Sequence, residues 1–351
     1  MSAVETVPSP VRGRSHYEGF RATIKAVGTG RRGWRDLSFE EAREAALALL
    51  SGASTDAQAG AFLVAMRIKG ETAAEMAGLA QGMRDNAVAL ECPTARPVVV
   101  SGGAYDGVAA APALSLAAAA GAAGAGAGMV LHCGRRLGPK YGTTPAEVLA
   151  ELGGPAAPSA ADSERMLARS GLTLVYTPHL MPGWDRLADV RDEVGVRGPL
   201  HSAERLIDWF GARRFVATYT HGQYADLLLE ALRLLGAHRT VASRGIEGSD
   251  VLRPGKPTVR CPEGELDLPG RPGLGLAGDP GPVASAEATW AVLSGAGDPA
   301  AARAVCLSAG VALWVAGLAR HPRAGVAEAE QSLRDGRAAR SLDAMLNTSA
   351  E

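Results

Sequence analysis

The sequence has few cysteines and almost no excess of either charge, and both shortages narrow the classes of protein that it can encode. Its 351 residues include four cysteines, none close enough to another to form a CxxC or similar metal-binding pattern. Scattered single cysteines are typical of structural thiols in a reducing cytoplasm. The formal net charge is −1, so no global basic field marks the chain as a nucleic-acid binder.

Long apolar runs are also scarce. The first thirty residues contain no apolar core segment, so no signal peptide is predicted. The uncharged stretch 108–131 is dominated by Ala and Gly and is interrupted by Pro112. It therefore predicts a small-residue helix packed in a core, followed by a strand, rather than a membrane span.

The N-terminal third of the chain has a helical pattern. Residues 1–17 are predicted to be disordered, and a basic run from Arg12 to Arg35 is expected to be a solvated, partly disordered start, with a partner-binding arm as the alternative. Ser38 and Glu41 form a capping-box pattern ahead of the first helix, and two more helices follow over 57–69 and 72–85. Residues 18–92 are thus expected to form a small helical bundle domain.

Strand and helix signals alternate after the bundle, and residues 93–351 are expected to form an α/β domain with a mainly parallel sheet. The Pro- and Gly-rich residues 253–283 indicate loops or hairpins, and residues 178–210 are a candidate for packing on the helical domain. The predicted strands lie at 98–100, 129–131, 172–176, 215–220 and 240–243. Helices are predicted at 146–152, 163–169 and 224–235, and two more close the chain at 300–318 and 326–346.

Two glycine-rich turns directly follow predicted strands. The turn at 132–144 holds one His, three cations, three glycines and two Thr hydroxyls, and the other turn spans 101–107. Glycines let backbone N–H groups approach oxygens, while Lys and Arg supply charge, so such a turn suits a phosphate-bearing ligand. A solvated basic loop is the alternative. If the strands are parallel, both turns lie at the same edge of the sheet.

Residues 37–83 resemble the N-terminal helical domain of the anthranilate phosphoribosyltransferases, and the resemblance continues more weakly over about residues 18–348. It implies a helical bundle joined to an α/β domain, and a homodimer formed through the bundle. It also implies transfer of a 5-phosphoribosyl group from phosphoribosyl pyrophosphate to the amine of anthranilate, with Mg²⁺ neutralising the departing diphosphate.

The family's diphosphate loop reads G-T-G-G-D-G, and residues 102–107 match it in part. Ala104 and Tyr105 stand where the family has two glycines, and further on Leu114 replaces the Mg²⁺-binding Ser. The family's next motif, K-H-G-N-R, is matched here by a His and an Arg, with Gly134 in place of Asn. The phosphate-binding candidates that the resemblance assigns are Gly102, Asp106, Gly107, Ser115, Arg135, Lys140, Gly142 and Thr143.

The resemblance also assigns acceptor and metal residues. Its acceptor-binding candidates are His132, Gly134 and Arg191, the last matching an Arg that holds the acceptor carboxylate. The family's D-G-x-D-E metal pair becomes a single carboxylate at Asp250, because Val251 replaces its neighbour. Glu247 is the second candidate metal ligand, and capping of a polar loop is its alternative role.

Together these motifs predict a phosphoribosyltransferase-like protein with a weakened diphosphate and Mg²⁺ site, acting on anthranilate or on an altered acceptor. One alternative is a non-catalytic relative that binds nucleic acid or another phosphate-bearing ligand. The other is a nucleoside phosphorylase, which needs a phosphate pocket and no Mg²⁺–diphosphate. A cytoplasmic homodimer without membrane contact is expected in each case.

Overall fold

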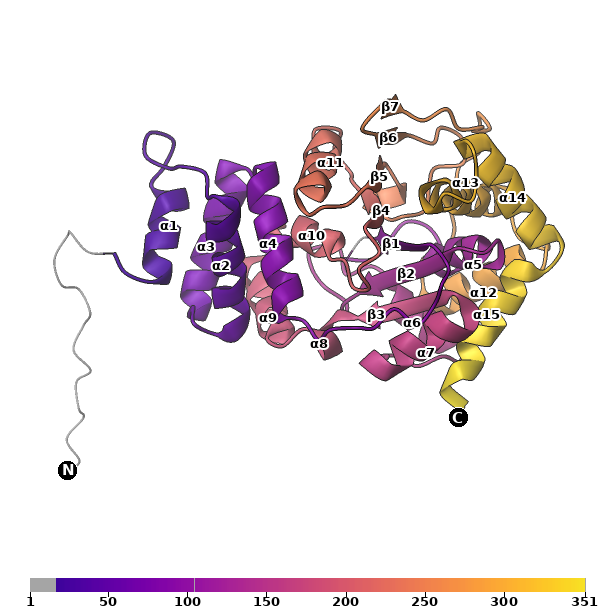
Figure 1. Cartoon of the computed structure of the whole chain (residues 1–351), viewed down its shortest axis with the longest axis horizontal. Helices are drawn as coiled ribbons and strands as arrows, with labels where there is room; N and C mark the ends of the chain where they lie inside the picture. The colour runs from indigo at the N-terminus through magenta and orange to yellow at the C-terminus, as the bar shows by residue number, and fades with distance from the viewer. Residues whose placement is uncertain (1–16, 104, 351) are drawn as a thin grey trace.

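The N-terminal helices form a bundle at one end of the molecule (Figure 1). The computed structural model describes residues 17–103 and 105–350, so most of the predicted disordered start lies outside the described residues. The bundle contains α1 (Phe20–Gly28), α2 (Phe39–Ser51), α3 (Asp56–Lys69) and α4 (Ala73–Asn86). The last three helices each begin at a capping box, the first of them with Ser38 and Glu41 as predicted.

Within the basic run, the expectation of disorder is wrong for residues 20–28, while the cations that the structure describes are exposed as predicted. Residues 20–28 form α1, and Phe20 packs on Phe62 of α3 with ring centroids 5.4 Å apart. The cations of this segment lie on a helix that buries Phe20 and Val27. The excess of cations in the sequence hid the apolar side of α1, because only two of its nine residues are buried.

The second part of the chain is built on a seven-stranded sheet with the order β3-β2-β1-β4-β5-β6-β7. The first five strands in this order are mutually parallel and the last two are antiparallel, which confirms the predicted mainly parallel α/β domain. The strands are β1 (Val98–Gly102), β2 (Gly128–Cys133), β3 (Leu172–Tyr176), β4 (Arg214–Thr218), β5 (Arg239–Ser243), β6 (Val259–Cys261) and β7 (Gly264–Glu265).

Helices rich in small residues cover the sheet and fill the second core. The prediction for 108–131 is confirmed, because α5 (Ser115–Gly124) is almost entirely buried and leads into β2. Helix α13 (Pro299–Ala316) is long and apolar enough to cross a membrane, yet 78% of it is buried against its neighbours. The other helices of this part are α6 (Pro145–Glu151), α7 (Ala160–Ser170), α11 (Tyr224–Leu234), α12 (Pro282–Leu293), α14 (Pro322–Arg334) and α15 (Arg337–Leu346).

The closing segment differs from its prediction. Residues 326–346 were expected to form a single helix, but α14 ends at Arg334 and α15 starts at Arg337. Gly336 has a φ of 74°, a left-handed conformation that glycine adopts without steric cost and that interrupts the helix. The apolar periodicity resumes after this turn, which explains why it suggested one helix.

The segment after β3 returns to the helical bundle. It contains α8 (Thr177–Leu180), α9 (Trp184–Val194) and α10 (Leu200–Ala203). Helix α9 contacts α2 and α3, and α10 contacts α4, so this segment joins the bundle to the sheet (Figure 1). Residues from the end of the sheet and from this segment consequently lie close to one another.

Candidate functional site

The loops that follow β1 and β2 meet at the carboxyl edge of the parallel sheet, as the strand order requires. The backbones of Val108 and Thr143 exchange two hydrogen bonds, 3.0 and 2.8 Å long. Gly107 has a φ of 75°, and a Cβ there would collide with the backbone of Gly142. These two glycines thus allow the loops to touch, which is a structural use of residues predicted to bind phosphate.

A buried carboxylate lies beside these loops. Asp250 is 6% exposed and accepts hydrogen bonds from the hydroxyls of Ser101 (2.9 Å) and Ser115. Burial raises its pKa, and the two hydroxyl bonds oppose that shift. A cavity of about 10 Å³, room for about one water molecule, is lined by Ser101, Gly103, Gly107, Val108, Ala113, Ser115, Leu131, His132, Thr143, Pro145, Ser249 and Asp250.

Lys140 lies between two carboxylates. Its Nζ is 3.5 Å from Asp106 and 3.6 Å from Glu247, and burial lowers its pKa while both carboxylates oppose the shift. Asp106 is also paired with Arg197. Glu247 accepts hydrogen bonds from the backbone amides of residues 109 and 110, at 3.1 and 2.7 Å. Glu247 thereby anchors the loop after β1, which is close to the capping role considered for it.

The remaining phosphate-binding candidates are more dispersed. Arg135 pairs with Asp189 of α9 and is 3.6 Å from Asp185. Its guanidinium therefore points to α9 and away from the sheet edge where Lys140 lies. Gly102 ends β1, where its carbonyl accepts a hydrogen bond of 2.8 Å from the Thr218 hydroxyl. The structure therefore gathers Asp106, Gly107, Ser115, Lys140, Gly142 and Thr143 at the sheet edge and leaves Arg135 beside α9.

His132 and Tyr105 form a buried pair. The Tyr105 hydroxyl is 2.6 Å from His132 Nδ1 and 2.9 Å from the Thr177 hydroxyl. Burial lowers the pKa of His132 to about 3 and raises that of Tyr105 well above its usual value, so both side chains are neutral. In the part of the chain that the structure describes, His132 Nε2 has no hydrogen-bond partner.

The other two acceptor-binding candidates are also occupied by side chains of the chain itself. The guanidinium of Arg191 donates two hydrogen bonds to Glu204, 2.9 and 2.7 Å long, with both side chains almost fully buried. A Cβ on Gly134 would collide with the indole ring of Trp184. An aromatic ring and a carboxylate of this protein thus lie against the residues that the resemblance assigns to an aromatic carboxylic acid.

Sequence reasoning missed these partner side chains. Tyr105 stands at a glycine of the family's diphosphate loop, and Glu204 stands at the glycine of the family's F-N-x-x-G-P segment, which residues 200–205 replace. Each position therefore carried a signal as a departure from a motif. Nothing in their spacing indicated that they would turn inward onto Arg191 and His132. By contrast, Cys133 of the glycine-rich turn is a buried thiol, in line with the structural role predicted for the scattered cysteines, and burial raises its pKa to about 12.

Comparison with known proteins identifies the family. Residues 21–87 match the family model described as the glycosyl transferase family, helical bundle domain. The chain is 32% identical over 345 residues to the anthranilate phosphoribosyltransferase of Rhodospirillum rubrum, covering 93% of this chain and 94% of that protein. The chain belongs to the anthranilate phosphoribosyltransferase family.

Other members of the anthranilate phosphoribosyltransferase family match at similar levels. The enzyme of Syntrophobacter fumaroxidans is 33% identical over 331 residues, covering 90% of this chain and 96% of that protein. The bifunctional protein TrpGD of Thermotoga maritima is 28% identical over 321 residues, and this chain spans 54% of its length.

Solved structures of the family share the fold. The Thermus thermophilus enzyme superposes with a TM-score of 0.80 at 29% identity, covering 90% of this chain and 97% of that one. The Saccharomyces cerevisiae enzyme, solved in complex with PRPP and Mg, superposes with a TM-score of 0.79, covering 94% of this chain and 98% of that one. At 18% identity, the second comparison speaks to the fold alone.

Proposed function

We propose that this protein binds phosphoribosyl pyrophosphate and transfers its 5-phosphoribosyl group to an acceptor other than anthranilate. Family membership supports the transferase part of the proposal. The single observation that carries it is the buried Asp250 carboxylate, which faces the loop after β1, accepts hydrogen bonds from two neutral hydroxyls and forms no ion pair with a cation among the described residues. A buried carboxylate without a cationic partner is suited to share a bound cation.

The donor set fits one Mg²⁺ ion held jointly with the diphosphate. Mg²⁺ usually takes one or two carboxylates and completes its shell with phosphate oxygens and water. Asp250 can supply a carboxylate, whereas Val251 is buried and apolar, and Glu247 is committed to the amides of 109 and 110. Within residues 17–103 and 105–350, no group of three or more His, Cys, Asp or Glu side chains is placed to hold a metal. The ion would neutralise the charge that develops on the diphosphate.

The residues of the sheet edge supply the rest of the phosphate binding in this proposal. Lys140 is already held in place by Asp106 and Glu247, so its ammonium is positioned before a ligand arrives. The Thr143 hydroxyl lines the same cavity as Ser115, whose own hydroxyl proton is donated to Asp250. Hydroxyl and ammonium donors of this kind stabilise phosphate oxygens, and their fixed geometry limits the reorganisation that binding requires.

The occupied acceptor residues support an acceptor different from anthranilate. Arg191 is neutralised by Glu204, so an acceptor carboxylate would have to displace a bidentate partner from a buried pair. Tyr105 and Trp184 fill the space next to His132 and Gly134. An acceptor without a carboxylate does not have to displace Glu204 from Arg191.

We expect calorimetric titration with phosphoribosyl pyrophosphate to show binding with a dissociation constant below about 1 mM, and tighter binding when Mg²⁺ is present. Mg²⁺ should raise the affinity for phosphoribosyl pyrophosphate about tenfold less, or less still, in Asp250→Asn than in the wild type, because the variant loses the anionic ligand. Asp267→Asn is the matched control, since Asp267 is exposed and pairs with Arg323. Absence of binding at about 1 mM, or an unchanged Mg²⁺ effect in Asp250→Asn, contradicts the proposal.

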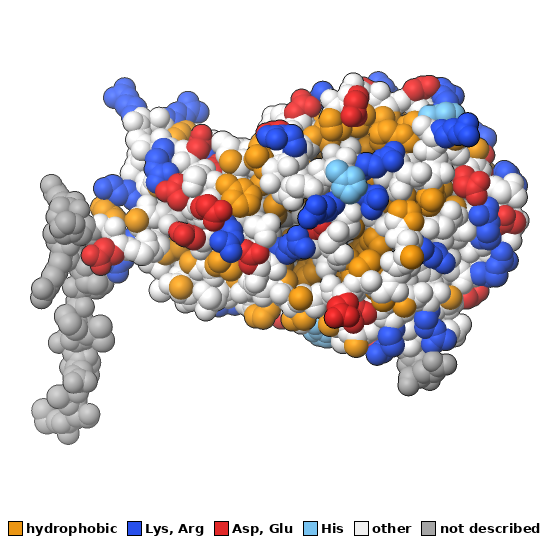
Figure 2. All heavy atoms as spheres, viewed as in Figure 1, with side chains coloured by type: hydrophobic (Ala, Val, Ile, Leu, Met, Phe, Trp, Pro, Cys, Tyr) orange, Lys and Arg blue, Asp and Glu red, His pale blue; other side chains and the backbone are white. Residues whose placement is uncertain are grey.

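A second candidate is a relative that binds a phosphate-bearing ligand without transfer. It is favoured by the small cavity beside Asp250 and by the internal pairing of Lys140 and Arg191. Several Lys and Arg side chains gather near the middle of the face seen in Figure 2, with acidic side chains on either side, so no continuous basic surface favours nucleic acid as that ligand. Binding of phosphoribosyl pyrophosphate without release of pyrophosphate, over a series of amine acceptors, would identify this second function.

We also propose a cytoplasmic homodimer formed through the helical bundle. Val64 and Ile68 on α3 are 36% and 69% exposed and lie four residues apart, so they form an exposed apolar pair on one face of that helix. Ile68→Arg should convert a dimer into a monomer in light scattering, because it places a charge in the interface. Val283→Arg, at an exposed apolar position on α12, is the matched control. A monomeric wild-type protein contradicts this proposal.

A further inference from the structure

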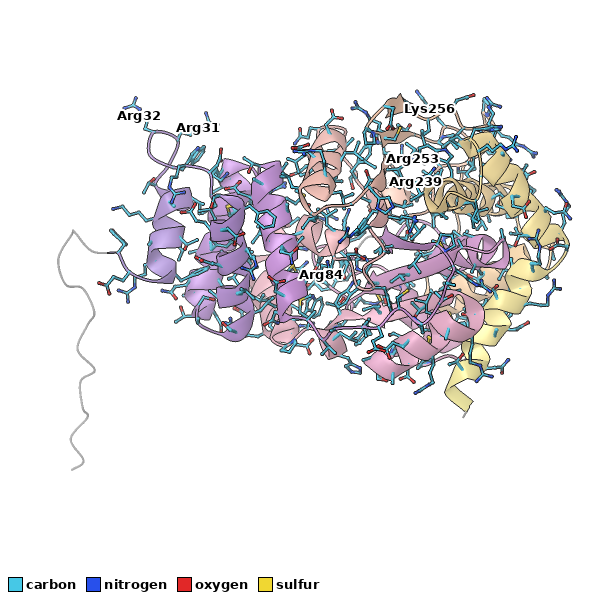
Figure 3. The ribbon with its side chains drawn as sticks, in the orientation of Figure 1. Arg31, Arg32, Arg84, Arg239, Arg253 and Lys256 are labelled. Carbon is cyan, nitrogen blue, oxygen red and sulfur yellow. The ribbon has the colours of Figure 1, made fainter. Side chains whose placement is uncertain are left out.

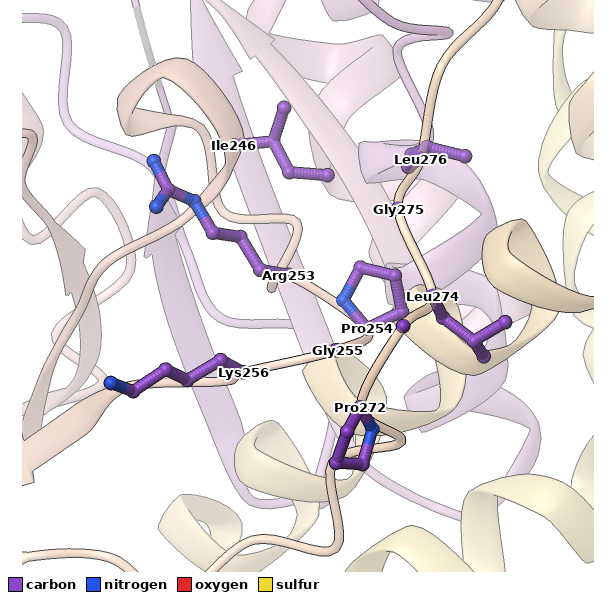
Figure 4. Close-up of a pocket in the computed structure, with 10 residues that line it drawn as sticks. Ile246, Arg253, Pro254, Gly255, Lys256, Pro272, Leu274, Gly275 and Leu276 are labelled. Carbon is purple, nitrogen blue, oxygen red and sulfur yellow. The ribbon is translucent and has the colours of Figure 1, made fainter.

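A separate hollow lies between the segment that leaves β5 and the loop that leads to α12 (Figure 4). Its volume is about 630 Å³, within the range of about 300–1,000 Å³ that is typical of small-molecule sites. The residues that line it are Ile246, Arg253, Pro254, Gly255, Lys256, Pro272, Gly273, Leu274, Gly275 and Leu276. None of the residues assigned above to phosphate, acceptor or metal binding is among them.

The two walls of this hollow are fastened to each other. The amide of Arg271 donates a hydrogen bond of 2.9 Å to the carbonyl of Pro254. Gly255 lies so close to the Leu274 carbonyl that a Cβ at 255 would be only 2.5 Å from that oxygen. Prolines at 254 and 272 restrict the backbone further. The hollow is therefore formed in the folded protein without a ligand, as most small-molecule sites are.

Its surface combines apolar walls with charge of one sign. Ile246, Leu274 and Leu276 are half-buried, and the lining contains no acidic side chain. Arg253 and Lys256 are exposed, and their side chains leave the same wall and diverge, with their charged ends apart (Figure 4). Among the described residues, neither cation has a hydrogen bond or an ion pair with an acid. Two uncompensated cations beside an apolar surface favour a ligand that carries both an anionic group and an apolar body.

We propose that this hollow binds a small organic anion with an apolar body, such as an aromatic or aliphatic carboxylate or sulfonate. The anionic group would contact the charged end of Arg253 or of Lys256, and the apolar body would lie toward Leu274 and Leu276. This site does not depend on the proposed transferase activity. It gives the chain a binding site separate from the sheet edge described above.

The position of the hollow links it to the loop after β1. Ile246 is the neighbour of Glu247, whose carboxylate holds the amides of residues 109 and 110. On the other wall, a Cβ on Gly278 would lie 3.3 Å from Pro112 Cγ, so this segment packs on the end of the same loop. A ligand that shifts either wall therefore acts on the loop that borders Asp250, and the coupling between the two sites must be reciprocal.

The test uses 8-anilinonaphthalene-1-sulfonate, an aromatic sulfonate whose fluorescence rises on binding to apolar surface. We expect one binding site per chain, weakened about tenfold or more by the double variant Arg253→Gln/Lys256→Gln, and weakened by added salt. The control is Arg31→Gln/Arg32→Gln, which removes two exposed cations from a loop at the far end of the molecule (Figure 3). In methyl-labelled protein, the probe should shift the signals of Leu274 and Leu276.

Equal probe affinity in the wild type and the Arg253/Lys256 double variant overturns the proposal, as does a shift confined to methyl groups outside the hollow. The coupling is tested by repeating the titration with phosphoribosyl pyrophosphate present. If phosphoribosyl pyrophosphate binds, the dissociation constant of the probe should change by at least about twofold. Failure of the proposed function would leave the probe titration itself unaffected, so the two failures can be told apart.

Discussion

Replacing Glu204 with alanine is expected to lower the free energy of unfolding by about 3–5 kcal/mol. The side chains of Arg191 and Glu204 are 3% and 0% exposed, so the variant leaves a guanidinium buried without its counter-charge. Arg191 Nε already lacks a partner among the described residues, which leaves no alternative acceptor at that atom. Urea denaturation followed by circular dichroism measures the loss.

The control for this prediction removes both charges. Arg191→Met/Glu204→Leu should recover most of the stability, because apolar residues of similar volume often replace a buried ion pair at little cost. If the single and double variants lose the same stability, the cost comes from lost packing and the charge argument is wrong.

The same variant tests the acceptor proposal. Anthranilate should not raise the melting temperature of the wild-type protein, because Glu204 occupies Arg191. In Glu204→Ala the guanidinium is free, so a ligand carboxylate can take the vacated place and stabilise the fold by mass action. Stabilisation of the wild type by anthranilate would show that Glu204 moves aside readily.

The sequence allowed the scaffold to be predicted because its signals are local. Caps such as Ser38 with Glu41 and the apolar runs of β1 and β2 each depend on a few neighbouring residues. Parallel pairing then places the loops after β1 and β2 at one edge, whatever their side chains. The contact between Gly107 and Gly142 follows from that topology and from the need for close backbone approach.

The contents of the site could not be predicted in the same way. Tyr105 reaches His132 and Thr177, and Glu204 reaches Arg191, across contacts that depend on how the segment 177–206 packs on the sheet. Motif comparison showed that Tyr105 and Glu204 replace glycines, but it could not predict where their side chains would point. A substitution that fills a site and one that merely crowds a loop look alike in sequence.

Removing the hydroxyl of Tyr105 is expected to lower the free energy of unfolding by about 1–3 kcal/mol, since Tyr105→Phe leaves His132 Nδ1 buried without a partner. Tyr105→Ala should cost about 3–5 kcal/mol, because it also empties the space of a fully buried ring. Tyr17→Phe is the control, since Tyr17 is 53% exposed and should change stability by less than about 0.5 kcal/mol. Urea denaturation distinguishes the three variants.

The hydrogen bonds of Tyr105 also determine where His132 carries its proton. If Thr177 donates to Tyr105 and Tyr105 donates to Nδ1, then Nε2–H is the single donor of these three side chains that lacks a partner among the described residues. If the ring donates instead, both the Nε2 lone pair and the Thr177 hydroxyl proton lack partners, which is the costlier arrangement. Nitrogen-15 spectra should therefore show a protonated Nε2 that does not titrate between about pH 5 and 8, because the pKa of His132 is lowered to about 3. In Tyr105→Phe this preference should weaken, and a wild-type spectrum with protonated Nδ1 would refute the assignment.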